Sequence, residues 1–128
     1  MGFRSPLGRA IGSGSARSGF EHWWGQRLSA AGLGLLGLWF VISIAGIGAA
    51  DHATVAAWIG SMPHAILLIL LVLTLLYHSN LGVNVVLEDY VHDGRALVLA
   101  LGLVRFAHVA MAVAGIYSIV SLSLGARA

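Results

Sequence analysis

The chain has 128 residues, of which 59% are hydrophobic and 9% are charged, and its net charge is +2 at pH 7. Soluble domains carry about 25% charged residues, so this composition excludes an ordinary soluble domain, a disordered tail and a small secreted protein. The chain has no cysteine, which excludes disulfides, zinc thiolate sites and iron–sulfur ligation by its own side chains. No basic stripe predicts binding of nucleic acid. The sequence therefore predicts an integral membrane protein with room for three or four helices.

Residues 1–20 are rich in glycine, serine and arginine and contain no apolar run of the kind that a signal peptide needs. We expect a cytoplasmic arm, which is either ordered by a partner or a loose terminus without a specific role. Further along the chain, the 23 residues from Leu28 to Ala50 include no Asp, Glu, Lys or Arg. A helix of that length rises about 34 Å, so we predict a first membrane span over about 28–50.

The next stretch without those four residue types has 36 residues, from His52 to Leu87. This length fits one helix and a loop. We expect the loop over Asp51–Met62 and the second span over about 63–87, with Pro63 in the first turn, where proline is tolerated.

The third span is predicted over about 95–124, interrupted by Arg105. The fold class is therefore all-α integral membrane, with three transmembrane helices in one anchor domain over 1–128. The positive-inside rule places the N-terminus and the 88–95 loop in the cytoplasm or its organellar equivalent, and the C-terminus outside. The arginines that precede the first span carry this prediction: Arg4, Arg9, Arg17 and Arg27.

Glycines recur along the first span, and small residues let helices approach closely within lipid. Because three helices hide little internal surface, we expect this span to pack within a larger helical bundle that includes a partner subunit. The glycines in question are Gly32, Gly34, Gly37, Gly46 and Gly48.

His78 lies inside the predicted second span, roughly 13 Å from its cytoplasmic end. Histidine is rare in a bilayer and often functional there. Three interpretations remain open: a neutral histidine bonded to a neighbouring helix, part of a proton path, or an axial ligand to haem iron.

Polar residues gather just after this span, from Glu88 to Arg95. They form either a solvated turn with an interfacial tyrosine or a pocket at the membrane edge for an amphipathic small molecule. In the second interpretation Tyr90 donates a hydrogen bond, and Asp89 orients it or supplies a proton.

The first span opens with two tryptophans that are typical of a membrane interface, followed by Arg27. Arg27 either extends to the interface or pairs with an anion, such as a carboxylate of a cofactor held by His78. Arg105 and His108 are three residues apart and are expected to share a helix face. We expect the remaining histidines near the interfaces to be exposed to water: His52, His64 and His92.

Three motifs, in their order and spacing, resemble those of the hydrophobic membrane anchor of succinate dehydrogenase (respiratory complex II), the D-subunit type. They are His-Trp-Trp-x-Gln-Arg-x-Ser-Ala at 22–30, His-Ser-x-Leu-Gly at 78–82 and Glu-Asp-Tyr-Val-His at 88–92. The spacing of twelve from His78 to Tyr90 also fits, and the resemblance covers nearly the whole chain.

The resemblance implies that His78 is an axial ligand of haem b, with the second histidine supplied by a partner anchor, a cytochrome b556-type C subunit. It implies that Tyr90 binds a ubiquinone carbonyl beside Asp89 and that Arg27 lies near the haem propionates. Succinate would be oxidised on a flavoprotein subunit, and electrons would pass through an iron–sulfur subunit to ubiquinone. The membrane would be the bacterial cytoplasmic or the mitochondrial inner membrane.

Two other functions remain open from the sequence. One is the anchor of a fumarate reductase, which runs in the opposite direction. The other is a non-redox scaffold or transporter subunit, although the broken helices and internal repeats of many transporters are not seen.

Overall fold

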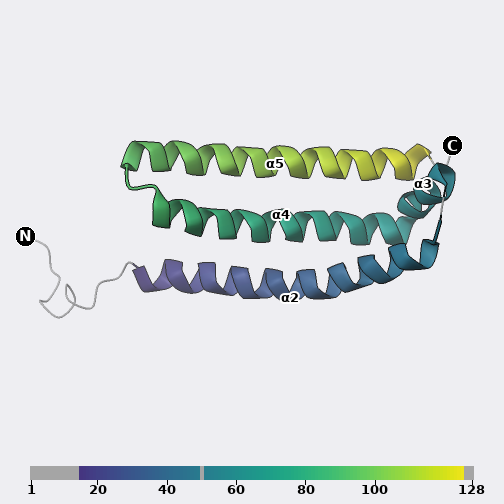
Figure 1. The fold of residues 1–128 in the computed structure, drawn as a ribbon, viewed down its shortest axis with the longest axis horizontal. Coiled ribbons are helices and arrows are strands. Elements are labelled where there is room, and N and C mark those ends of the chain that lie inside the picture. Colours follow the sequence, from purple (N-terminus) through teal and green to yellow (C-terminus); the bar gives the residue numbers. More distant parts are fainter. Residues whose placement is uncertain (1–14, 50, 126–128) are drawn as a thin grey trace, which may run out of the picture.

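The computed structural model describes residues 15–49 and 51–125 and contains, within them, only helices. These are α2 (Ser15–Ile47), α3 (His52–Gly60), α4 (Met62–Tyr90) and α5 (Gly94–Gly125). The three long helices lie side by side, with α4 packed between α2 and α5 (Figure 1). Each of the three is long and apolar enough to cross a membrane. The predicted fold class, an all-α integral membrane protein with three spans, is confirmed.

The second and third spans lie close to their predicted bounds, whereas the first does not. The first helix begins at Ser15 and ends at Ile47, so residues 15–20 of the predicted cytoplasmic arm are helical. No proline interrupts this segment, and a helix satisfies its own backbone in water as well as in lipid. The rest of the predicted arm, residues 1–14, lies outside the described residues. Gly48 ends the helix with a φ of +66°, a conformation that side chains disfavour.

The segment predicted as a loop, Asp51–Met62, contains α3 instead. The Asp51 carboxylate caps this helix by accepting the Thr54 N–H at 2.9 Å. Hydrogen bonds from Thr54, through its side chain and then its backbone, lower the pKa of Asp51 below 3.8. Ser61 alone separates α3 from α4. Pro63 lies in the first turn of α4, as predicted.

The start of α2 and the turn between α4 and α5 lie at one end of the layer, and α3 and the end of α5 lie at the other (Figure 1). We call these the Tyr90 end and the α3 end. Ser123 of α5 donates a hydrogen bond to the Gly60 carbonyl at 3.0 Å and thereby joins α3 to α5. This arrangement puts the 88–95 segment beside the start of the first span, as the sequence predicts.

Aromatic rings from three helices stack at the α3 end. Trp58 of α3 lies 6.1 Å from Trp39 of α2 and 4.8 Å from His64 of α4, measured between ring centroids. His64 is therefore half-buried, and the expectation that it is water-exposed is wrong. His52 and His92 are exposed, as predicted.

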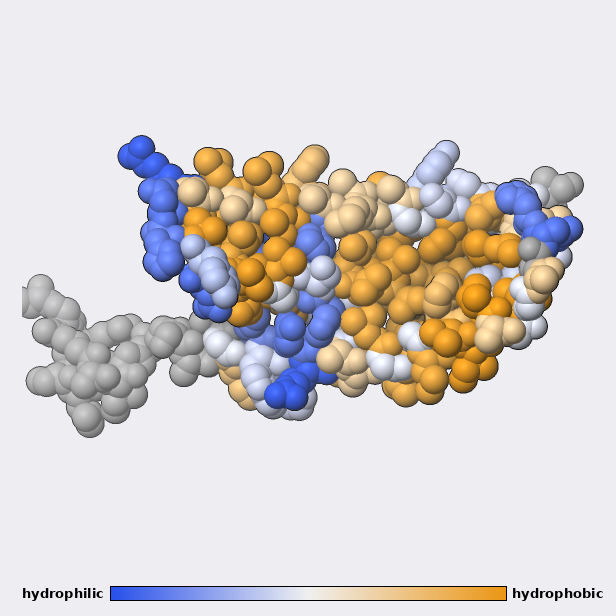
Figure 2. Space-filling model, in the orientation of Figure 1, coloured by the Kyte–Doolittle hydropathy of each residue, from blue (hydrophilic) through white to orange (hydrophobic). Residues whose placement is uncertain are grey.

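The three helices bury very little of their own apolar surface. Ala65 and Leu68 are the only buried hydrophobic residues in the described part of the chain. Figure 2 shows hydrophobic residues over most of one face, with hydrophilic residues concentrated towards the Tyr90 end and again at the α3 end. Such a surface needs lipid or other protein around it.

The glycines of the first span behave differently from one another. A Cβ at Gly32 would lie 3.3 Å from the Thr74 methyl group, so this glycine packs against α4. A Cβ at Gly34, Gly37 or Gly46 would meet nothing within 4 Å. Close helix packing is therefore confirmed within this chain for Gly32, and packing of the others against a partner stays a prediction.

Candidate functional site

His78 lies on α4 where this helix packs against α2. Its Nδ1 atom is 2.9 Å from the hydroxyl oxygen of Ser29 on α2. His78 is half-buried, whereas Ser29 is only 6% exposed. The structure thus brings together two residues that are 49 positions apart, and their contact occupies one of the two ring nitrogens of His78.

Gly25 lets the helices approach at this point. A Cβ on Gly25 would lie 2.6 Å from the Tyr77 hydroxyl oxygen and 3.3 Å from a Leu81 methyl carbon. Gly25 and Ser29 are one helical turn apart and therefore share a face of α2. The absence of a side chain at Gly25 brings the Ser29 hydroxyl within reach of His78.

Asp89 and Tyr90 lie at the end of α4, about 17–18 Å along the helix from His78. Eleven helical residues return to nearly the same face, so Asp89 projects from the face of α4 that carries His78, whereas Tyr90 is turned about 120° from it. Both are exposed, and the Tyr90 side chain is 78% exposed.

The residues that follow Tyr90 build the turn into α5. The His92 ring N–H donates to the Tyr90 carbonyl at 3.1 Å. The Asp93 carboxylate accepts the N–H groups of Arg95 and Ala96 at 3.0 and 2.8 Å, which caps α5. His92 and Asp93 thus fit the turn interpretation of this segment, and the side chains of Asp89 and Tyr90 are exposed beside the turn.

Arg27 is on α2 but is not brought together with His78. Two helical residues are about 200° apart, so Arg27 projects from nearly the opposite face to Ser29. It is exposed, and its guanidinium lies 5.5 Å from the centroid of the Trp23 ring. This cation–π contact holds the Arg27 guanidinium over Trp23, one helical turn nearer the Tyr90 end.

Three amide side chains, carried by α2 and by the Tyr90 half of α4, were not among the predicted site residues. Buried atoms of all three have no hydrogen-bond partner among the described residues: Gln26 Oε1, Asn80 Nδ2 and Asn84 Oδ1. The signal was present, because amides inside an apolar span are costly and often functional.

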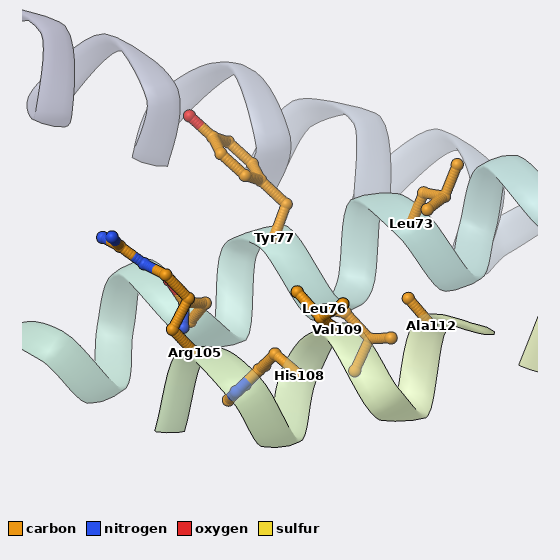
Figure 3. A pocket seen from close by; sticks show the side chains of 8 residues that line it. Leu73, Leu76, Tyr77, Arg105, His108, Val109 and Ala112 are labelled. Carbon is orange, nitrogen blue, oxygen red and sulfur yellow. The ribbon is translucent and has the colours of Figure 1, made fainter. Parts of the chain in front are cut away.

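Arg105 and His108 share a face of α5, as predicted, and line a groove of about 220 Å³ between α4 and α5. In Figure 3, the Arg105 and Tyr77 side chains both extend towards the same end of the groove. His108 donates its Nδ1–H to the Val104 carbonyl at 2.8 Å, so its Nε2 accepts the Ser79 hydroxyl at 3.2 Å. Both ring nitrogens are occupied, and His108 connects the two helices.

Within the described ranges, no three His, Cys, Asp or Glu residues are grouped so that they could hold a metal ion together. A haem would need no such group, because its porphyrin supplies four ligands and the protein supplies only axial ligands, for which histidine is common. The imidazole of His78 fits this role, since its Nε2 has no hydrogen-bond partner in the part of the chain that the structure describes.

Comparisons with known proteins agree with these motifs. Residues 1–116 match the family of succinate dehydrogenase/fumarate reductase transmembrane subunits. The chain is 38% identical over 90 residues to the succinate dehydrogenase hydrophobic membrane anchor subunit of Rickettsia bellii, an alignment that covers 70% of this chain and 71% of that protein. It is 28% identical over 126 residues to the subunit of that name from Paracoccus denitrificans, which covers 98% and 97% of the two chains. No solved structure matches the chain. The chain therefore belongs to the family of succinate dehydrogenase/fumarate reductase transmembrane subunits, as a multi-pass protein similar to the hydrophobic membrane anchor.

Proposed function

We propose that this chain anchors a succinate:ubiquinone oxidoreductase in the membrane, shares a haem b with a second anchor subunit and forms part of the ubiquinone site. The observation that carries the proposal is the position of His78. It lies inside a membrane-spanning helix with Nδ1 engaged by Ser29, and its Nε2 is left for a ligand. Histidine with this arrangement is typical of metal ligation.

In this proposal His78 Nε2 would hold the haem iron together with a histidine of the partner anchor. A haem with two axial histidines takes up and passes on single electrons. Asp89 lies on the same face of α4 as His78, about 17 Å nearer the Tyr90 end. The half-buried position of His78 agrees with a cofactor that is covered on its other side by the partner.

Tyr90 would bind the quinone head group. Its phenol donates a hydrogen bond to a quinone carbonyl oxygen, and this bond strengthens as negative charge develops on that oxygen. Asp89 is adjacent and exposed, so it is placed to pass protons from water. The membrane edge suits this reaction, because the quinone tail needs lipid and its reduction needs two protons.

Arg27 would contact the haem propionates only from the side of α2 that faces away from α4. This role requires the haem edge to reach around α2, or Arg27 to leave the Trp23 ring. A contact between Arg27 and the haem propionates therefore stays a prediction.

The complex would contain a flavoprotein subunit and an iron–sulfur subunit docked at the Tyr90 end. The iron–sulfur subunit would then deliver electrons close to Tyr90. The positive-inside rule assigns this end to the cytoplasm or the mitochondrial matrix.

The first experiment is a dithionite-reduced minus oxidised visible spectrum of the complex purified in mild detergent, from wild type and from Tyr90→Phe. Both should show the α-band of a b-type haem. We expect Tyr90→Phe to reduce ubiquinone about 100-fold more slowly, since it lacks the hydrogen-bond donor. Succinate oxidation with a soluble artificial acceptor should be unchanged.

Tyr117→Phe is the matched control, because Tyr117 is also a highly exposed tyrosine, at 73%, but lies on α5 nearer the α3 end. Equal ubiquinone rates in the two variants would remove Tyr90 from the site. A wild-type complex that contains all its subunits and no haem would refute the role of His78. A complex that reduces fumarate with quinol much faster than it oxidises succinate would favour the fumarate reductase alternative.

A further inference from the structure

We infer that Ser29 is a positioning residue for His78: its hydroxyl oxygen accepts the Nδ1–H and thereby keeps Nε2 unprotonated and fixed in direction. The inference rests on the proposed function only in naming haem iron as the ligand of Nε2. The protonation of the ring follows from contacts within this chain.

The Ser29 hydroxyl has one proton and three polar neighbours. Its oxygen lies 2.6 Å from the Gly25 carbonyl, 3.1 Å from the Gln26 carbonyl and 2.9 Å from His78 Nδ1. A carbonyl oxygen only accepts hydrogen bonds. Two oxygen atoms 2.6 Å apart would repel each other unless a proton lay between them, so the Ser29 proton is directed to Gly25.

The remaining lone pairs of the Ser29 oxygen then face His78 Nδ1. An acceptor on this side requires the imidazole to donate, so the neutral ring carries its proton on Nδ1 and has a bare lone pair on Nε2. If Ser29 donated to Nδ1 instead, Nε2 would carry the proton and could not bind a metal. The short contact with Gly25 therefore selects the tautomer that His78 needs.

Burial makes this selection persistent. Ser29 is the only buried polar residue in the described part of the chain, at 6% exposed, so water and lipid do not compete for its oxygen. The bond also joins α2 to α4 and so restrains rotation of the imidazole ring. An acceptor on the second ring nitrogen of a histidine ligand raises its basicity and commonly changes metal affinity by 10- to 100-fold.

The test compares Ser29→Thr with Ser29→Val in the purified complex. Threonine and valine have nearly the same shape, but only threonine keeps the hydroxyl. We expect the threonine variant to behave as wild type. The valine variant should bind haem about 10- to 100-fold more weakly, and any haem that it retains should have a higher midpoint potential, because a less basic ligand stabilises ferric iron less. Haem is counted per flavin so that assembly and haem loss are measured separately.

Ser118→Val is the control for loss of a hydroxyl within a span, since among the described residues the Ser118 hydroxyl bonds only to the Ala114 carbonyl of its own helix, at 2.9 Å. We expect its haem content and potential to equal those of wild type. Equal haem content and equal potential in Ser29→Thr and Ser29→Val would overturn the inference and leave the proposed function standing. A wild-type complex without haem would instead contradict the proposed function.

A second measurement needs no haem and no valine variant. The ¹⁵N chemical shifts of His78 in the full chain in detergent distinguish a protonated Nδ1 from a protonated Nε2. We expect the proton on Nδ1 in wild type and in Ser29→Thr. A proton on Nε2 in wild type would overturn the inference even if the valine variant fails to assemble.

Discussion

Replacing Ser79 with alanine should loosen the packing of α4 on α5, because it removes the hydrogen bond that His108 Nε2 accepts at 3.2 Å. The His108 Nδ1–H is already committed to the Val104 carbonyl, so the ring has no second donor or acceptor to offer. Hydrogen bonds between membrane helices contribute about 0.6 kcal/mol on average and at most about 1.7 kcal/mol. The length of this bond, near the upper limit for hydrogen bonds, favours the lower value, which is about a threefold change in the unfolding equilibrium.

A double-mutant cycle with Ser79→Ala and His108→Leu isolates this contribution. The free energy of unfolding would be measured on the full chain in bicelles by denaturant titration. We expect a coupling energy of about 0.6 kcal/mol between the two sites, and a change within about 0.5 kcal/mol for Ser118→Ala, which removes a hydroxyl without an interhelical partner. A coupling energy of zero would refute the argument that His108 serves to join the helices.

Two further predictions test the packing and the cap of α3. A Cβ at Gly115 would lie 3.2 Å from a Val72 methyl carbon, whereas one at Gly102 would meet nothing within 4 Å. Gly115→Leu should therefore separate α4 from α5 and lower the melting temperature, whereas Gly102→Leu should leave it unchanged. Equal melting temperatures in the two variants would show that α4 adjusts freely. Hydrogen bonds from Thr54 lower the pKa of Asp51 below its unfolded value of 3.8, so the cap stabilises α3 above about pH 4 and this contribution is lost as the pH falls through the folded pKa. Hydrogen-exchange protection of α3 should then decrease in acid for wild type but stay constant in Asp51→Asn, which keeps an acceptor without a titration, and parallel pH profiles would contradict the role of the carboxylate.

The sequence predicts the spans well because long uncharged runs have one stable solution in lipid, a helix that bonds its own backbone. It does not predict α3, because the uncharged run from His52 to Leu87 looks alike inside and outside the membrane. The capping carboxylate of Asp51, three residues before Thr54, was the available signal for a helix start.

The position of each site residue along its helix was predictable from the sequence, but the direction in which its side chain projects was not. His78, Asp89 and Tyr90 lie on α4 at the expected heights, since a rise of 1.5 Å per residue fixes them. Arg27 was expected to pair with a carboxylate of a cofactor held by His78, but its helical phase relative to Ser29 turns it away from α4. The contact between Ser29 and His78, and the stacking of His64 on Trp39, depend on which helix faces pack together, and one sequence does not specify that.

The polar side chains of α4 are unevenly distributed along its length, with an electrical consequence. His78, Asn80 and Asn84 lie in the half nearer Tyr90, whereas the nine residues 65–73 are all apolar. That apolar stretch is about 13 Å long, and an ion entering it would lose its hydration without gaining a partner. Along α4, the half nearer α3 therefore opposes the passage of ions, whereas the half nearer Tyr90 carries polar side chains inside the membrane span.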